Sequence, residues 1–188
     1  MRLLITAAVL CSLPLIHGCA AVAIGGAAAG GYMVGEERRT AGTLTNDQTI
    51  EFRISNRVTE KYPNSHVNST AYNRMVLLTG EAPSAEAKAD IEKIARSVPD
   101  VRDVYNELTV APASPLSARA TDTYLTSKVK TRFVDNGKFN PLHVKVVTER
   151  ETVYLMGLVK RPEADAATQI ARTTPGVKRV VRVFEYQE

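Results

Sequence analysis

The chain of 188 residues contains one sequence pattern twice, and this internal repeat constrains its fold more than any other feature. Apolar residues occupy every fourth position in residues 50–58 and again in residues 125–133. A His-Val pair then precedes a Val-x-Leu-x-Gly segment, first within residues 66–80 and later within residues 143–157. The repeat therefore predicts two similar modules rather than one large domain.

Each copy is expected to form a helix, two strands, a second helix and a last strand. Apolar residues at every fourth position are typical of one buried helix face. The first helix is predicted to begin at Asp47 in one copy and at Asp122 in the other, because aspartate is favoured at helix N-caps. The second helix is expected between Ser84 and Pro99, and again from Pro162 to just before Pro175. The strands are expected at residues 67–72, 75–80 and 101–110 of the first copy and at 144–148, 152–157 and 177–186 of the second.

An αββαβ unit of this size suits an α+β fold with a three-stranded sheet and both helices on one face. The predicted domains are residues 47–110 and 122–188, and a proline-containing linker at residues 111–121 joins them. Modules of about 64 residues bury little core alone, which favours packing of the two copies against each other. Gly80 and Gly157 end equivalent strands, where a missing side chain permits a positive φ or a close approach of the backbone.

The N-terminus has the layout of a signal peptide. A basic residue precedes a largely apolar run at residues 3–16, which is short for a membrane-spanning helix of about 20 residues. The Ile-His-Gly-Cys sequence at residues 16–19 resembles the bacterial lipobox, although His17 departs from the small residue usual at its position. This resemblance implies removal of residues 1–18, acylation of Cys19 by fatty acids such as palmitate, and sorting to the outer membrane.

Residues 19–46 are rich in Ala, Gly and Thr and show no sustained periodicity, so they are predicted to form a flexible tether behind the acylated cysteine. An alternative is a spanning helix that continues through residues 20–34, with Gly26 and Gly30 as a GxxxG packing face. Alanine and glycine are only weakly apolar, however, whereas acyl chains contribute about 0.8 kcal/mol for each buried CH₂ group. We therefore favour attachment by lipid, with the folded part facing the periplasm.

Two such modules behind a lipobox resemble the BON-domain proteins. The resemblance is carried by residues 67–80 and 103–107 of the first copy and by residues 123–130, 153–159 and 175–180 of the second. It implies a dual BON-domain lipoprotein that supports outer-membrane integrity, is enriched at the division site and binds anionic phospholipid such as phosphatidylglycerol. The first helix of the second module is the implied lipid-binding element, and an outer-membrane assembly complex is an implied partner.

Charge is divided unequally between the two modules. Residues 47–110 contain eight Lys or Arg and ten Asp or Glu, a net charge of −2, whereas residues 122–188 contain twelve and eight, a net charge of +4. A tyrosine beside cations suits a lipid interface, and the predicted phospholipid-binding residues are Tyr124, Leu125, Lys128, Lys130 and Arg132. The alternative is a basic helix face that is merely solvated. The first copy offers a comparison, because Thr49 and Ser55 stand at the places of Tyr124 and Lys130.

The sequence predicts no enzyme, no metal site and no cofactor. His66 and His143 lack a second His or Cys at metal-ligand spacing, so both are expected to be structural. Glu149 and Glu151 flank a predicted turn, where exposure is expected and no catalytic pair arises. The absence of Trp and an aromatic content of 6% disfavour a nucleic-acid platform. The alternative function is a protein-binding adapter that offers strand edges or helix faces to an envelope assembly factor.

Overall fold

The computed structural model describes residues 37–188, and residues 38–188 form one compact unit. The predicted signal peptide, Cys19 and most of the predicted tether lie outside the described residues. Within the described part, every helix is too short or too polar to cross a membrane.

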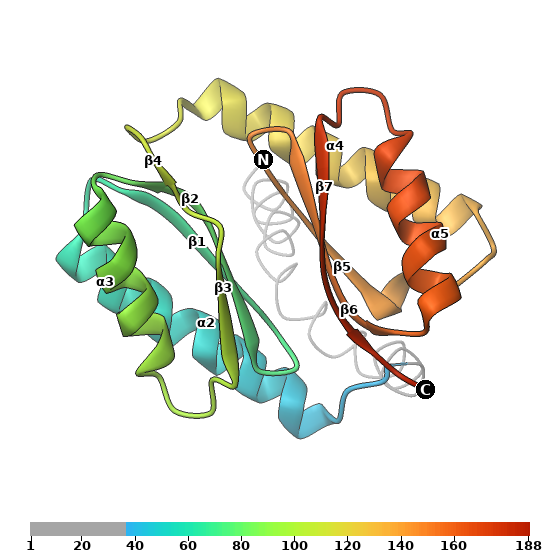
Figure 1. Cartoon of the computed structure of the whole chain (residues 1–188), viewed down its shortest axis with the longest axis horizontal. Coiled ribbons are helices and arrows are strands. Elements are labelled where there is room, and N and C mark those ends of the chain that lie inside the picture. Colours follow the sequence, from blue (N-terminus) through green and yellow to red (C-terminus); the bar gives the residue numbers. More distant parts are fainter. Residues whose placement is uncertain (1–36) are drawn as a thin grey trace, which may run out of the picture. The chain divides into compact units, whose positions relative to one another are not determined.

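The order of elements follows the predicted repeat (Figure 1). The first module consists of α2 (Ala41–Lys61), β1 (His66–Tyr72), β2 (Met75–Ala82), α3 (Ala85–Arg96), β3 (Asp103–Asn106) and β4 (Thr109–Val110). The second module consists of α4 (Leu116–Asp135), the short 3-10 helix η1 (Pro141–His143), β5 (Val144–Glu149), β6 (Thr152–Val159), α5 (Arg161–Arg172) and β7 (Arg179–Tyr186). The α+β fold with two αββαβ modules is therefore confirmed.

Each sheet has the second strand of its hairpin in the middle. In the first module β2 pairs antiparallel with β1 and parallel with β3 and β4, and in the second β6 lies in the same way between β5 and β7. The single last strand predicted for the first copy is wrong, because it breaks between Asn106 and Thr109. At this break Leu108 packs into the core with 2% of its surface exposed, and its amide N–H donates to Oδ1 of Asn106 over 3.2 Å.

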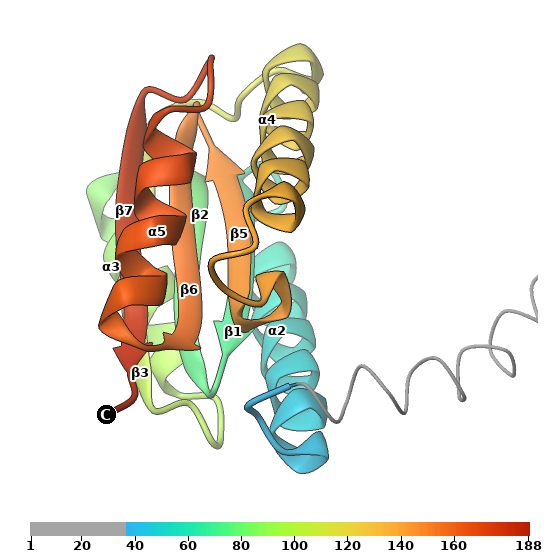
Figure 2. The same cartoon turned by 90° about the vertical axis from the view of Figure 1, so that its right-hand side faces the viewer.

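The two sheets face each other, and the helices of each module cover the opposite face of its own sheet (Figures 1 and 2). A shared apolar cluster joins the inner faces and contains Tyr72, Leu77, Tyr154, Met156 and Val183. Alternate residues of β2 and β6 point to the helices or to the other module, so almost every residue of both strands is buried. The modules thus pack together, as their small size favoured.

The predicted start of the first helix in each module is wrong. Helix α2 begins at Ala41, where Oγ1 of Thr40 accepts a hydrogen bond from the amide of Thr43 over 3.1 Å. The predicted tether therefore gives way to helix before residue 46. Helix α4 likewise begins at Leu116, so the second half of the predicted linker is helical.

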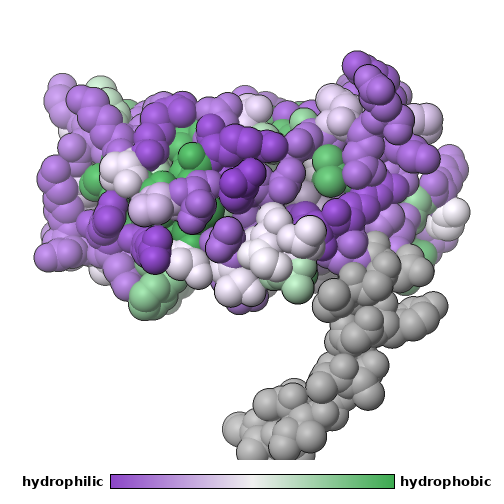
Figure 3. Space-filling model, turned by 90° about the horizontal axis from the view of Figure 1, so that it is seen from below, coloured by the Kyte–Doolittle hydropathy of each residue, from purple (hydrophilic) through white to green (hydrophobic). Residues whose placement is uncertain are grey.

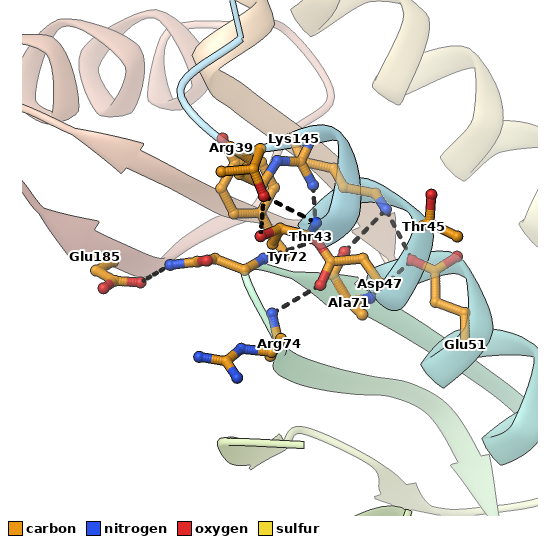
Figure 4. A network of polar contacts seen from close by, with 12 residues as sticks. Arg39, Thr43, Thr45, Asp47, Glu51, Ala71, Tyr72, Arg74, Lys145 and Glu185 are labelled. Carbon is orange, nitrogen blue, oxygen red and sulfur yellow. Dashed lines mark hydrogen bonds and ion pairs between the residues drawn. The ribbon is translucent and has the colours of Figure 1, made fainter. Parts of the chain in front are cut away.

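Asp47 and Asp122 lie inside these helices and are buried. The two carboxylate oxygens of Asp47 accept hydrogen bonds from the amides of Asn73 and Arg74 over 2.8 and 2.7 Å (Figure 4). Both turn residues have positive φ angles, 50° and 65°. Asp122 accepts equivalent bonds, over 2.9 and 2.8 Å, from the turn between β5 and β6. Each aspartate therefore anchors a tight hairpin turn to the helix that covers it.

Gly80 and Gly157 lie where the backbone of the neighbouring strand approaches closely. A Cβ atom at Gly80 would stand 2.0 Å from the carbonyl oxygen of His66, and one at Gly157 would stand 2.3 Å from that of His143. Gly80 also has a φ of +106°, which side chains rarely adopt.

Candidate functional site on helix α4

The predicted lipid-binding residues divide between the surface and the interior. Tyr124 is 63% exposed, whereas Leu125 is only 3% exposed. Leu125 belongs to the buried stripe of α4, and a Cβ atom added at Gly176 would stand 2.7 Å from its Cδ2. The prediction that Leu125 binds phospholipid is therefore wrong, because its side chain packs into the core.

Arg132 joins α4 to the C-terminal end of α5. Its guanidinium donates to the carbonyl oxygen of Ile170 over 3.0 Å and to the hydroxyl groups of Thr174 and Thr173 over 2.7 and 3.1 Å. A cation at a helix C-terminus stabilises the last carbonyl groups. Arg132 therefore has a structural role, because its guanidinium holds the end of α5 through a carbonyl group and two hydroxyl groups.

Lys128 lies on the same flank of α4 as Arg132. Its Nζ donates to the carbonyl oxygen of Pro175 over 3.1 Å and stands 5.7 Å from the centre of the Tyr124 ring. Tyr124 and Lys128 therefore form one exposed pair beside the loop that follows α5.

Lys130 faces the opposite flank, about 200° further round the helix than Lys128. There it lines a pocket of about 400 Å³ together with Val134 and Leu142. Arg39, Tyr72, Phe133, Pro141, Val144 and Lys145 complete the lining. The structure therefore separates the predicted cations into two groups instead of gathering them on one stripe.

The pocket combines apolar side chains with cations. Val134 is 69% exposed and Leu142 is 42% exposed, although both are apolar. Nζ of Lys145 lies 2.8 Å from Oε1 of Glu51, and the guanidinium of Arg39 lies 3.8 Å above the centre of the Tyr72 ring. The sequence analysis missed Val134 and Leu142. Val134 could have been noticed, because it is an apolar residue of α4 outside the buried stripe.

Two arginines fix the chain where it joins the compact unit beside this pocket. The guanidinium of Arg38 binds both carboxylate oxygens of Glu163 over 2.6 and 2.7 Å, and it lowers the pKa of that carboxyl group. Arg39 pairs with Oδ2 of Asp47 over 2.9 Å, inside the network shown in Figure 4. The segment that leads back toward Cys19 therefore leaves the unit next to the pocket.

The face seen in Figure 3 is mostly hydrophilic, and its apolar areas are small and separate. This face therefore offers no broad apolar surface for attachment to a membrane. Metal-ligating residue types gather elsewhere in the described part of the chain, where His66, Glu81 and Glu149 meet between the modules.

Comparison with known proteins identifies the repeat. Residues 46–112 and 121–188 each match the BON domain family. The chain is 37% identical over 174 residues to the outer membrane lipoprotein DolP of Haemophilus influenzae, covering 91% of this chain and 90% of that protein. It is 30% identical over 151 residues to a 21 kDa hemolysin of Actinobacillus pleuropneumoniae, covering 79% of this chain and 78% of the hemolysin.

A further relative is the osmotically-inducible protein Y of Escherichia coli, which is 27% identical over 155 residues, covering 80% of this chain and 77% of that protein. The BON match covers both modules, and the likeness to the Haemophilus lipoprotein spans nearly the whole length of both chains. The chain therefore belongs to the BON-domain family, as a dual-domain outer-membrane lipoprotein.

Proposed function

We propose that this protein binds anionic phospholipid at the α4 pocket of its second BON domain, and that it supports outer-membrane integrity as a binding protein rather than as an enzyme. The observation that carries the proposal is the pocket lined by Lys130, Val134 and Leu142. A phospholipid presents a phosphate beside acyl chains, and this pocket offers a cation beside exposed apolar side chains.

The strength of such a contact is modest, so it must act together with an anchor. One cation near an anionic membrane surface contributes about 1 kcal/mol, and salt weakens this attraction. Acylation at Cys19 would supply the stable attachment, because stable anchoring takes more than one acyl chain or a chain plus a basic patch. The pocket then selects which lipid the second domain touches.

The geometry of the chain is compatible with this division of labour. Arg39 lines the pocket, and the residues between Cys19 and Arg38 span at most about 65 Å when fully extended. An anchor at Cys19 in the inner leaflet of the outer membrane would thus hold the pocket within reach of lipid headgroups, with the BON domains in the periplasm. Enrichment at division sites would follow if anionic lipid is enriched there.

The test uses a fragment of residues 38–188, because a shorter fragment from Asp47 would cut into α2. NMR spectra are recorded while phosphatidylglycerol or phosphatidylcholine micelles are added. We expect shifts at Lys130, Val134 and Leu142 with the anionic lipid, and weaker shifts as salt is raised. Equal response to the neutral lipid would contradict the proposal.

Matched variants assign the contact to one flank of α4. Lys130→Glu should reduce the response to phosphatidylglycerol, whereas Ser55→Glu, at the equivalent position of α2, should leave it unchanged. Tyr124→Glu combined with Lys128→Glu tests the other flank, and loss of binding there with retention in Lys130→Glu would move the site to that flank. Absent lipid binding, together with a protein crosslinked through the first domain, would favour the adapter function instead.

A further inference from the structure

Three metal-ligating side chains from both modules meet at one end of the interface between the sheets. His66 begins β1, Glu81 lies opposite it on β2, and Glu149 ends β5 of the other module. Nδ1 of His66 lies 3.1 Å from Oε2 of Glu81 and 3.8 Å from Oε1 of Glu149. Donor atoms of the three residues all lie within 4.8 Å of one another.

The carboxylates of Glu81 and Glu149 are buried, and hydrogen bonds and ion pairs replace only part of their lost hydration. The side chains of Glu81 and Glu149 are only 1% and 6% exposed, so the exposure expected of Glu149 is wrong, because the packing of the two sheets covers it. Oε1 of Glu81 accepts no hydrogen bond from the described residues, and its cation partner Arg150 stands 3.8 Å away with half its own side chain in solvent. Burial raises the pKa of Glu149, although His66 and the hydrogen bond from Asn68 act in the opposite direction.

We propose that Nδ1 of His66 and the carboxylates of Glu81 and Glu149 bind one divalent transition-metal ion, for which Zn²⁺ is the best match. Ligands about 2.0 to 2.2 Å from a tetrahedral Zn²⁺ stand roughly 3.3 to 3.6 Å apart, and the two measured separations from Nδ1 bracket this range. An imidazole with two carboxylates suits Zn²⁺ better than Mg²⁺ or Ca²⁺, which prefer oxygen ligands alone.

Neighbouring groups already hold the ligands in position. Nδ2 of Asn68 donates to Oε2 of Glu149 over 3.0 Å. The amide of Ser114, in the segment between the modules, donates to Oε2 of Glu81 over 3.0 Å. Such contacts orient metal ligands and limit the rearrangement that binding requires.

A path to the site is also present. His66, Asn68 and Glu149 line a pocket of about 340 Å³, which leaves room for a water molecule as the fourth ligand. To bind the ion, Nδ1 of His66 must present its lone pair, so the ring carries its hydrogen on Nε2. This requirement gives a spectroscopic signature that is independent of stability.

The second copy shows that the fold itself does not require the acidic residues. Leu158 follows Gly157 in β6, where Glu81 follows Gly80 in β2. Tyr72 occupies the end of β1, where Glu149 ends β5, and its hydroxyl donates to the carbonyl oxygen of His143 over 3.4 Å. One carboxylate also lies near His143, with Oε1 of Glu163 at 4.0 Å from Nδ1, but both of its oxygens are bound by Arg38. The His66 end differs, because it holds two buried carboxylates and one of them has an oxygen without a hydrogen bond from the described part of the chain.

A bound ion would crosslink the hairpin of the first domain to the hairpin of the second. Its ligands come from β1, β2 and β5, which belong to both sheets. Because the ion binds the packed arrangement of the domains, its presence should stabilise that arrangement in proportion to the logarithm of its concentration.

The test uses the full chain, purified from membranes in detergent with a tag that contains no histidine and treated with a chelator. Titration with Zn²⁺ should show one ion bound per chain and a melting temperature that rises with Zn²⁺ concentration. We expect Glu149→Gln and His66→Ala to weaken binding at least tenfold. His143→Ala is the matched control at the equivalent position of the second domain, and it should bind as the unchanged chain does.

A second measurement needs no variant. Nitrogen NMR of the imidazole rings should show a large shift of Nδ1 of His66 when Zn²⁺ is added, with the hydrogen on Nε2. No saturable uptake, unchanged uptake in Glu149→Gln, or an unaltered His66 ring in the presence of bound Zn²⁺ would each overturn the proposal. Preference for Mg²⁺ over Zn²⁺ would overturn it as well, because an imidazole ligand disfavours Mg²⁺.

Discussion

Replacement of Asp122 by asparagine separates two explanations of why an aspartate stands near the start of each module. If Asp122 were a helix N-cap, Asn would serve almost equally well, because the two residue types are equally favoured there. In the structure Asp122 is instead buried in α4, and its two oxygens accept the amides of Arg150 and Glu151 over 2.9 and 2.8 Å. The two explanations therefore predict different costs for the same substitution.

The expected cost follows from the two hydrogen bonds. Asn keeps one acceptor oxygen but turns a donor group toward the second amide, so one charge-assisted bond is lost and one N–H is left unsatisfied. A hydrogen bond to a charged group contributes about 1.5 to 3 kcal/mol, so Asp122→Asn should lower the free energy of unfolding by about 2 to 3 kcal/mol. Asp47→Asn should cost more, because Asp47 also pairs with the nearly buried Arg39.

The assay is equilibrium unfolding of residues 38–188 in guanidinium chloride, followed by circular dichroism. Asp135→Asn is the matched control, because Asp135 lies on the same helix and is exposed. A change in Asp122→Asn of less than about 0.5 kcal/mol, equal to that of a neutral surface substitution, would refute the proposed anchoring of the turn.

Two further predictions concern backbone packing and pH. Gly157→Ala should lower the free energy of unfolding by about 1 to 3 kcal/mol, because its Cβ would overlap a backbone carbonyl oxygen. Gly80→Ala should lower it further, because the positive φ at Gly80 adds strain. Thermal unfolding of both variants measures these changes. Arg38 lowers the pKa of Glu163, so this pair contributes stability above the ordinary glutamate pKa and loses it as the pH falls through the lower folded pKa. Glu163→Gln should therefore reduce the acid dependence of unfolding measured between about pH 7 and about pH 3, and an unchanged dependence would argue against the pair.

The repeat predicted the order of elements because each helix and strand buries a face that its own periodicity reveals. The start of α2 and α4 could not be predicted in this way, because Asp47 and Asp122 bind a turn that is distant in sequence. A local pattern cannot distinguish an aspartate that caps its own helix from one that accepts hydrogen bonds from a hairpin. The break between β3 and β4 was missed for a related reason, since Leu108 leaves the strand to fill the core.

The surface of α4 was partly predictable. The buried stripe placed Tyr124, Lys128 and Lys130 outside the core, and the structure shows all three at least partly exposed. What surrounds them depends on tertiary packing, because the loop after α5 approaches Lys128 whereas η1 and β5 approach Lys130. The separation of these cations was therefore beyond the reach of helical periodicity.

The cluster of His66, Glu81 and Glu149 could be predicted only in part from the sequence. A two-residue turn at Asn73 and Arg74 fixes the register of the hairpin, and this register places Glu81 opposite His66. Glu149 comes from the other module, so only the docking of the two sheets brings it to His66. Metal-ligand spacing along one segment of chain therefore gave no sign of the proposed site.

Because one unit is duplicated, the interface between the sheets has two equivalent ends. Different residues occupy equivalent positions at the two ends, so the ends differ in chemistry. His66 and Glu149 meet at one end, whereas Tyr72 and His143 meet at the other, beside the α4 pocket. The length of β1 puts about 20 Å between the ends, and two unit charges at that distance interact by less than about 1 kcal/mol even at an effective dielectric constant of about 20. The buried carboxylates should therefore have little effect on the attraction of Lys130 for an anionic headgroup.

This separation makes the two proposals independently testable in one set of proteins. Glu149→Gln should weaken the binding of Zn²⁺ at least tenfold and leave the response to phosphatidylglycerol unchanged. Lys130→Glu should reduce the response to phosphatidylglycerol and leave the binding of Zn²⁺ unchanged. Both responses are followed by NMR on the same samples. If either substitution altered both responses, the ends of the interface would be coupled through the packing of the domains, and the electrostatic argument for their independence would fail.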